Sequence, residues 1–461
     1  MASVSASSVG STATCGGDVA DTDAGVLPRS RREVVPSGSQ PPVVLPAVIA
    51  ADGVAFAVLS GLDGSAAWQA ARVLLVVVVT AWAIWFTRRA GRAGRGGTAL
   101  VLGIAGTVAG AGTASAHLAK AGLDPAAAAA VVVLVTGVVL LVWGSAMLVR
   151  ATPGWWRLLA VPAALVLLWF VLLPLAVAVN ATNRPAGPLG PATPARYGLG
   201  YQDVVFSTAD GVRLSAWYIP PRNGAAVVLL PGAGSTRSAV LGQAAVLARH
   251  GYGTLLVDTR GHGRSGGHTM DFGWWGDRDL AAAVSFLVRQ PGIRAGKIAA
   301  LGESMGGEQA LAAAGSDPRI RAVIAEGATG QQLADHGWRP GGTELTLQRG
   351  MEWVMYTAAG LISGAPRPIS IPDAIRAADG RSTLIIAGGA VADEPVAARW
   401  FRAASPAAVQ VWVVPHAGHT QGLTAAPQAW EAHVIGFLNV ALRPTWRFGS
   451  DAVPPMVSLP R

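Results

Sequence analysis

The chain has 461 residues, of which 51% are hydrophobic and only 13% are charged, so its length suits one catalytic domain together with a strongly apolar segment. The formal net charge of +9 comes largely from arginines beside apolar runs. No zinc-ligand cluster or continuous basic helix accompanies it, which argues against nucleic acid as a partner. Cys15 is the only cysteine, so the chain has no intrachain disulfide and no cysteine nucleophile to compete with a serine.

Residues 1–42 are rich in Ser, Gly, Thr and Pro, and we expect a disordered tail there because such a composition buries too little apolar surface to fold. The segment 43–180 is predicted to be a transmembrane region, since it holds five apolar runs near the ~20 residues that cross a bilayer. The runs lie at 43–61, 67–87, 98–118, 126–149 and 157–179. The first contains Asp52 and a proline, which disfavour insertion, so the sequence predicts four or five spanning helices. Gly106 and Gly110 form a G-x-x-x-G pair, which reflects either a helix contact or chance in a glycine-rich segment.

Basic residues predict the orientation of this region. They cluster in two connecting loops, 88–97 and 150–157, whereas the other loops carry little positive charge. The positive-inside rule places those two loops in the cytoplasm, so the fifth run delivers the rest of the chain to the extracytoplasmic side of the cell membrane. The same basic residues predict contact with anionic membrane lipids.

A Pro- and Gly-rich linker is expected at 181–200, an α/β domain at 201–443 and a C-terminal tail at 444–461. Within the domain, apolar runs of strand length alternate with helical patterns, which is typical of a doubly wound, mostly parallel sheet. The stretch from about 327 to 375 departs from that alternation. It is either a cap over the site or a helix packed on the sheet edge.

A serine lies at the apex of a strand–turn–helix pattern. Ser304 follows the apolar run 298–300 and is flanked by Gly302 and Gly306, in the sequence Leu-Gly-Glu-Ser-Met-Gly-Gly. A G-x-S-x-G turn of this kind strains the backbone of the serine, exposes its hydroxyl and needs small neighbours where strand and helix cross. We interpret Ser304 as a catalytic nucleophile, and a simple glycine-rich connection is the alternative.

A histidine after the last predicted strand, 409–414, is the candidate base. His419 lies in the loop Pro-His-Ala-Gly-His-Thr, beyond the end of that strand where open α/β sheets place their working groups. His416 in the same loop is the competing base. His262 and His268 lie in an earlier loop, where a lone histidine is most often only solvated. We therefore assign the role of base to His419.

The candidate acid follows the predicted strand 382–389. Asp393 and Glu394 are the first carboxylates after it, at the start of a helix near Pro395. A carboxylate there would accept the second N–H of the histidine, fix its tautomer and stabilise the imidazolium. The competing interpretation is that these residues only cap the helix. We favour Asp393 as the acid, with Glu394 as the alternative.

A glycine-rich turn supplies a candidate oxyanion hole. The strand 225–230 is followed by Pro-Gly-Ala-Gly-Ser-Thr, so the backbone N–H of Ala233 could act with that of Met305 on a tetrahedral intermediate. Such donors are worth on the order of 3–4 kcal/mol each. A phosphate-binding loop is the rival, but no Gly-Lys-Ser/Thr follows. Asp258, in Asp-Thr-Arg-Gly-His-Gly-Arg-Ser, comes too early to be the triad acid, and we assign it to loop structure.

Together these motifs, from about 201 to 442, resemble the α/β-hydrolase family, and most closely its membrane-anchored Bem46-like and serine aminopeptidase-like branch. Members open with a two-stranded segment like 204–218 and then carry the oxyanion loop, D-x-R-G-x-G-x-S, G-x-S-x-G, an acid loop and a final histidine, in that order. This chain departs at Pro231, where the family usually has histidine, at His416, where it usually has glycine, and in a longer acid loop. The resemblance implies esterase, lipase, peptidase, thioesterase or acyltransferase activity without specifying the substrate.

The sequence therefore predicts a serine hydrolase anchored by N-terminal helices. Ser304, His419 and Asp393 (or Glu394) would cleave an ester, thioester or amide through an acyl-enzyme, with no metal and no organic cofactor. The expected partners are a small-molecule or lipid-like acyl substrate and the membrane lipids. Two alternatives stay open: a transacylase acting on a lipid or cell-envelope acceptor, and a non-catalytic membrane binding module.

Overall fold

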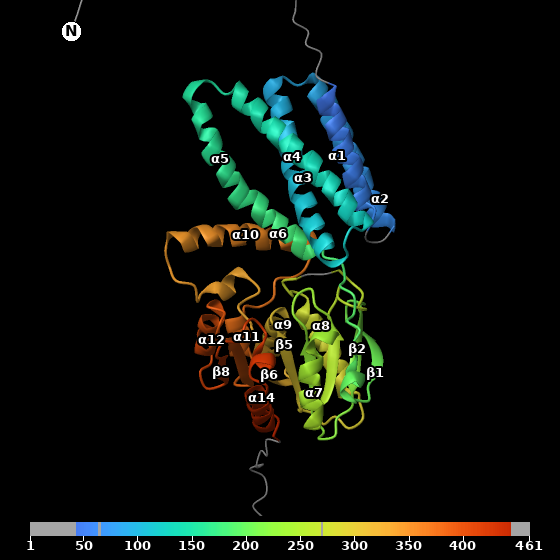
Figure 1. Cartoon of the computed structure of the whole chain (residues 1–461), viewed down its shortest axis with the longest axis vertical. Helices are drawn as coiled ribbons and strands as arrows, with labels where there is room; N and C mark the ends of the chain where they lie inside the picture. Colours follow the sequence, from blue (N-terminus) through green and yellow to red (C-terminus); the bar gives the residue numbers. More distant parts are fainter. Residues whose placement is uncertain (1–42, 63–65, 269–270, 444–461) are drawn as a thin grey trace, which may run out of the picture. The chain divides into compact units, whose positions relative to one another are not determined.

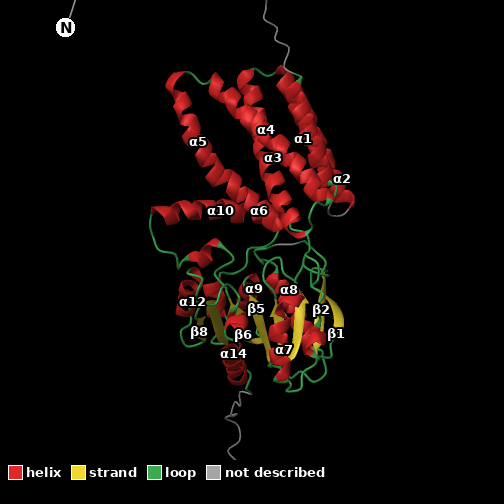
Figure 2. Cartoon of the chain, viewed as in Figure 1, coloured by secondary structure: helices red, strands yellow, loops and turns green. Residues whose placement is uncertain are grey.

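The computed structural model describes residues 43–62, 66–268 and 271–443. The two expected tails, with Cys15, lie outside the described residues. Within the described part, an all-helical segment comes first in the chain and all the strands come after it (Figure 1, Figure 2). The expected fold class, a helical region followed by a mostly parallel α/β sheet, is confirmed.

The first segment consists of long apolar helices: α1 (Val44–Ser60), α2 (Ala66–Arg89), α3 (Arg92–Lys120) and α4 (Pro125–Ala151). A further helical stretch changes type along its length, through η1 (Gly154–Leu159), α5 (Ala160–Leu167), the π-helical η2 (Leu168–Leu172) and α6 (Leu173–Thr182). Four helices of the described chain are long and apolar enough to cross a membrane, namely 69–89, α3, α4 and 154–182. Helix α1 is apolar but has only 17 residues.

Glycines let α3 and α4 pack with their backbones in contact. A Cβ at Gly106 would lie 2.9 Å from the Cα of Gly137, and a Cβ at Gly110 would lie 2.4 Å from a backbone nitrogen of α4. Beside this contact, Thr136 Oγ1 donates a 2.7 Å hydrogen bond to the buried Asp52 of α1. The G-x-x-x-G pair is therefore part of a helix–helix contact, as small residues are in membrane bundles.

The second segment is built on one sheet of eight strands, in the order β1-β2-β4-β3-β5-β6-β7-β8. The strands are β1 (Gln202–Ser207), β2 (Arg213–Ile219), β3 (Ala226–Leu230), β4 (Gly253–Asp258), β5 (Ile298–Glu303), β6 (Ile320–Glu326), β7 (Ser382–Gly388) and β8 (Val409–Val414). Strand β2 runs antiparallel to both β1 and β4, and all other neighbours are parallel. The carboxyl ends of β3 to β8 therefore share one edge of the sheet, where ligands of such folds bind.

Helices cover both faces of the sheet, which explains why its central strands are apolar without alternation (Figure 2). Along β3, Val228 packs into one core, whereas Val227 and Leu229 pack into the other. The first core is closed by α8 (Gly276–Val288), α9 (Met305–Ser316), α11 (Ile371–Ala377) and α12 (Asp393–Ala403). The second is closed by α7 (Leu241–Arg249) and α14 (Pro427–Ala441). Short turns η3 (Pro194–Tyr197), η4 (Arg237–Val240) and α13 (Gly422–Ala425) lie in the loops.

The irregular stretch 327–375 forms η5 (Leu333–His336), α10 (Thr343–Ser363) and α11. Helix α11 packs on α9, whereas α10 packs on α6 and η2 of the helical segment. Ala178 of α6 shares a small buried core with Trp274, Tyr356 and Ala359. The long helix of this stretch is therefore not a sheet-edge helix, because it joins the domain to the last apolar helix of the first segment.

Candidate active site

Ser304 lies in a sharp turn between β5 and α9, with φ 51° and ψ −122°, a region that a residue with a Cβ rarely adopts. The chain crowds tightly around it: a Cβ at Gly302 would lie 2.1 Å from the carbonyl carbon of Gly306. A Cβ at Gly306 would in turn lie 2.5 Å from Leu230 O at the end of β3. Both glycines of the motif are thus required by backbone contacts, and the serine remains partly exposed at the carboxyl edge of the sheet.

His419, in the loop after β8, pairs with a buried carboxylate. Its Nδ1 lies 2.6 Å from Glu394 Oε1, and Glu394 Oε2 accepts the N–H of Gly388 at 2.7 Å. Glu394 is 1% exposed, whereas the His419 side chain is 50% exposed. The hydrogen bond to Glu394 raises the pKa of His419 above its ordinary value. Because an ionised carboxylate only accepts, the pair holds the proton on Nδ1 and leaves Nε2 as the basic nitrogen.

The structure places Glu394, and not the favoured Asp393, against His419. Asp393 is the first residue of α12 and faces solvent, whereas Glu394 points inward beneath the loop after β8. Successive residues of a helix project about 100° apart, so only one of the two can face the histidine. The competing base, His416, is exposed and makes no hydrogen bond or ion pair within the described residues.

Ser304 and His419 approach each other across the end of β6. The N–H of Ser304 donates to Glu326 O at 2.7 Å. At the next residue, Gly327, a Cβ would lie 3.0 Å from both Cε1 and Nδ1 of His419. In the described part of the chain no hydrogen bond joins Ser304 Oγ to His419, and catalytic hydrogen bonds of this kind often shorten only in the substrate complex.

Both residues that the sequence predicts as oxyanion donors lie beside Ser304. The loop after β3 passes so close that a Cβ at Gly232 would lie 3.4 Å from Ser304 Cβ, and Ala233 follows at an exposed position. Met305 is the first residue of α9, so its N–H has no acceptor within the helix. The structure thus brings Ala233 and Met305 together with Ser304, as the sequence suggests.

Two side chains from elsewhere in the chain contact the loop after β3, which holds Ala233. His262 Nε2 accepts the N–H of Gly234 at 3.1 Å, while its Nδ1 lies 3.0 Å from Arg260 O and can only donate there. Lys120 Nζ, at the end of α3, donates to Gly234 O at 2.9 Å. His262 is 2% exposed, so it is not the solvated loop histidine expected from the sequence. The position of His262 inside the Asp-x-Arg-Gly-x-Gly motif could have indicated a structural role from the sequence.

Two glutamates at the ends of β5 and β6 were missed by the sequence interpretation. Glu326 accepts hydrogen bonds from the N–H of Gly422 at 2.7 Å and from Trp430 Nε1 at 3.0 Å, so it fastens the chain that follows His419 to the sheet. Glu303, next to the nucleophile, accepts from Gln243 Nε2, and burial raises its pKa to about 8. Burial also raises the pKa of Glu326. Each glutamate is the last residue of a buried strand, and this position in the sequence could have indicated a role near the site.

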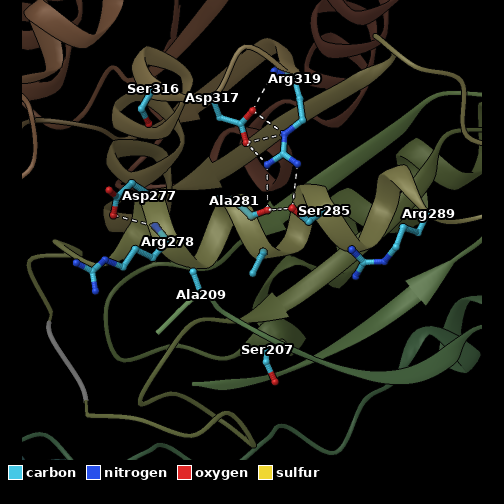
Figure 3. Close-up of a pocket in the computed structure, with 11 residues that line it drawn as sticks. Ser207, Ala209, Asp277, Arg278, Ala281, Ser285, Arg289, Ser316, Asp317 and Arg319 are labelled. Carbon is cyan, nitrogen blue, oxygen red and sulfur yellow. Dashed lines mark hydrogen bonds and ion pairs between the residues drawn. The ribbon is translucent and has the colours of Figure 1, made fainter. Parts of the chain in front are cut away.

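A pocket of about 510 Å³ lies along α8 (Figure 3). Arg319 is held there by Asp317 Oδ2 at 2.6 Å and Ser285 Oγ at 2.9 Å (Figure 3). None of the candidate site residues lines this pocket, and of its three lining arginines (Arg278, Arg289 and Arg319) Arg319 is paired with Asp317. It is therefore no part of the site at the carboxyl edge of the sheet.

The sheet order and the serine turn define the C-terminal segment as an α/β-hydrolase domain. Residues 221–357 match the family model Hydrolase_4, described as serine aminopeptidase, S33. Among solved structures, the esterase Pf2001 of Pyrococcus furiosus is 24% identical, with 56% of this chain and 98% of that chain covered and a TM-score of 0.46.

Curated relatives match a shorter region. Polyketide transferase grgF of a Penicillium species is 35% identical over 132 residues, which cover 27% of this chain and 43% of the relative. Thiohydrolase aneE of Aspergillus aculeatus is 36% identical over 129 residues, with 27% and 40% covered. An uncharacterized protein of Mycobacterium tuberculosis is 34% identical over 126 residues, with 27% and 44% covered. The chain thus spans less than half the length of these curated relatives.

Proposed function

We propose that this protein is a membrane-anchored serine hydrolase that cleaves a carboxylic ester or thioester through an acyl-enzyme. The observation that carries the proposal is the hydrogen bond between His419 Nδ1 and the buried Glu394, beside a serine in a strained turn. A carboxylate that orients a histidine, with the histidine next to a serine, is the arrangement that activates a serine hydroxyl group. A thiohydrolase among the relatives fits the same class of reaction.

In the proposed mechanism, His419 Nε2 removes the proton of Ser304 as Oγ attacks the carbonyl carbon of the substrate. The N–H groups of Ala233 and Met305 donate to the oxygen that becomes negative. His419, now protonated on both nitrogens and stabilised by Glu394, gives its proton to the leaving alcohol or thiol. Water then attacks the acyl-Ser304 with His419 again as base, which releases the carboxylic acid and restores the enzyme.

The helical segment supplies the proposed anchor. Its four long apolar helices have the length and composition to cross a bilayer. Arginines at the end of α2 and the start of α3, and at the end of α4, favour a cytoplasmic position for those two turns. The hydrolase domain would then lie on the extracytoplasmic side, with lipid-like or small acyl compounds as substrates.

A fluorophosphonate probe tests the proposal, because it reacts only with an activated serine. Purified full-length protein is treated with the probe beside the variants Ser304→Ala and His419→Ala, and the adduct is located by mass spectrometry. We expect an adduct on Ser304 that requires His419. Turnover by Ser304→Ala equal to that of the wild type on every ester tried would show that the proposal is wrong.

Transacylation is a second candidate, favoured by the relatives that are named polyketide transferases. In that reaction an alcohol or amine in place of water attacks the acyl-Ser304. Product analysis with and without an added acceptor alcohol separates the two. Acyl transfer to the acceptor that exceeds hydrolysis at low acceptor concentration would identify a transacylase.

A further inference from the structure

Helix α10 presents an apolar side that the described chain leaves largely exposed. Leu347, Val354 and Leu361 recur every seven residues, or about two turns, and therefore share one side of the helix. Leu347 is 51% exposed and Leu361 is 82% exposed, Val354 between them is partly exposed, and Ile362 beside Leu361 is 48% exposed. Large exposed apolar patches of this kind mark surfaces that contact a partner or a membrane.

The opposite side of α10 is buried in the domain. Glu352, Tyr356 and Ala359 are its buried residues, at intervals of four and three. Glu352 Oε2 accepts a hydrogen bond from His336 Nδ1 at 2.9 Å, and Arg339 pairs with the same carboxylate. These buried contacts fix the orientation of α10 about its own axis, so its apolar side faces away from the α/β domain.

The contacts of α10 with the helical segment indicate what covers this side. Helix α10 packs on α6 and η2, and both belong to the stretch 154–182 that is apolar enough to cross a membrane. Ala178, four residues before the end of that stretch, packs with Tyr356 and Ala359. An amphipathic helix that packs on a membrane-crossing helix near its end lies at the depth of the lipid headgroups, where its apolar side can enter the bilayer.

The buried side of α10 leads to the nucleophile. Tyr356 and Trp274 have ring centroids 6.0 Å apart, and Trp274 Nε1 donates to Gln331 O at 2.9 Å. In the same loop, Gly273 lies so close to Met305 that a Cβ there would be 2.8 Å from Met305 Cγ. A continuous set of packed apolar and aromatic side chains therefore connects α10 to the residue that follows Ser304.

We propose that α10 lies in the lipid–water interface and that the substrate of Ser304 is an ester or thioester whose long acyl chain resides in the bilayer. The statement about the substrate rests on the proposed function, whereas the statement about α10 does not depend on catalysis.

Spin labels test the position of α10 directly. A Cys15→Ser protein has no cysteine, so Leu361→Cys and Val354→Cys can be labelled singly and reconstituted in nanodiscs. Val135→Cys on α4 serves as the reference in the bilayer and Val440→Cys on α14 as the reference in water, since both side chains are exposed. Power saturation with oxygen and with a water-soluble nickel chelate reports the depth of each label.

We expect labels at 354 and 361 to resemble Val135→Cys, with high access to oxygen and low access to nickel. Access like that of Val440→Cys would overturn the proposal. Spin–spin broadening at 361 that disappears on dilution with unlabelled protein would also overturn it, because a second copy would then cover α10. A Val135→Cys label in water would instead refute the membrane anchor, which separates that failure from failure of the inference.

Activity tests the substrate class. Leu361→Glu is compared with Val440→Glu on two esters, a water-soluble acetate and a palmitoyl ester carried in vesicles. A charge on the membrane face weakens contact with lipid, so we expect turnover of the vesicle-borne ester to fall at least about tenfold in Leu361→Glu alone. Turnover of the acetate should stay within about twofold. Equal turnover of the vesicle-borne ester by Leu361→Glu and the wild type would overturn the proposed substrate class.

Discussion

Replacement of Glu394 is the most discriminating test of the site, because two neighbouring carboxylates differ only in where α12 points them. In the wild type the two oxygens of Glu394 accept the Nδ1–H of His419 and the N–H of Gly388. Glu394→Gln keeps the size of the side chain, but its amide NH₂ must face one of these two donors. If the NH₂ faces His419, Nδ1 must accept and the histidine takes the wrong tautomer; if it faces Gly388, two N–H groups oppose each other and His419 keeps only a neutral acceptor. We expect kcat to fall on the order of 10⁴-fold, which is the cost of such a change in a serine triad.

The matched control is Asp393→Asn. Asp393 is exposed at the start of the same helix, so removal of its charge should change kcat by no more than about twofold. Both variants are assayed on one chromogenic ester, and thermal unfolding checks that each is folded. Wild-type kcat in Glu394→Gln, or a comparable loss in Asp393→Asn, would refute the assignment of the acid.

The pH profile gives a second readout of the same pair. The base must be neutral, and Glu394 raises the pKa of His419, so wild-type kcat/KM should rise with pH through a midpoint above the ordinary value for histidine. Without the carboxylate the pKa of His419 falls, so the midpoint in Glu394→Gln should move to lower pH. An unchanged midpoint across roughly pH 5–9 would show that another group controls the profile.

Three further predictions follow from neighbouring parts of the chain. His262→Ala leaves the N–H of Gly234 without its buried acceptor, so the oxyanion loop should shift and kcat should fall roughly 10²-fold; unchanged kcat would exclude this support. Glu303 keeps its proton in the folded state up to about pH 8 but loses it near 4.5 when unfolded, so wild-type stability should decline as pH rises through that interval, by up to roughly 5 kcal/mol. Thermal unfolding of Glu303→Gln should show a flatter dependence, and a parallel curve would contradict the burial argument. Gly137→Leu should destabilise the purified protein because a Cβ would lie 2.5 Å from the backbone of α3, whereas Gly97→Leu, with no atom within 4 Å, should not; equal melting temperatures would contradict the close packing of α3 and α4.

Much of the fold could be predicted because its signals are local. The apolar runs that became α2, α3 and α4 have almost no polar side, and the strands β3 to β7 are short apolar runs bounded by turns. Which helices pack against each other was harder to predict from the sequence. Gly106 and Gly110 could not be told from chance glycines, because their role depends on the position of Gly137 in another helix.

At the site, residues with backbone roles were predictable and residues that act across the fold were not. Ser304 is marked by the glycines that its turn requires, and His419 by its place after the last strand. The choice between Asp393 and Glu394 depended on the rotation of α12, which begins one or two residues earlier than its sequence pattern suggests. The contacts of His262 and Glu326 join segments far apart in the chain, so the motif position of the first and the strand-end position of the second mark the residues without revealing their partners.

Capture of the covalent intermediate tests the central claim most directly. The full-length protein is mixed with a chromogenic ester, quenched in acid within the first turnovers, digested and analysed by mass spectrometry. The account predicts an acyl group on the peptide that contains Ser304, which is absent in Ser304→Ala. An acyl group on another residue, or steady turnover by Ser304→Ala with no acyl-peptide, would contradict it.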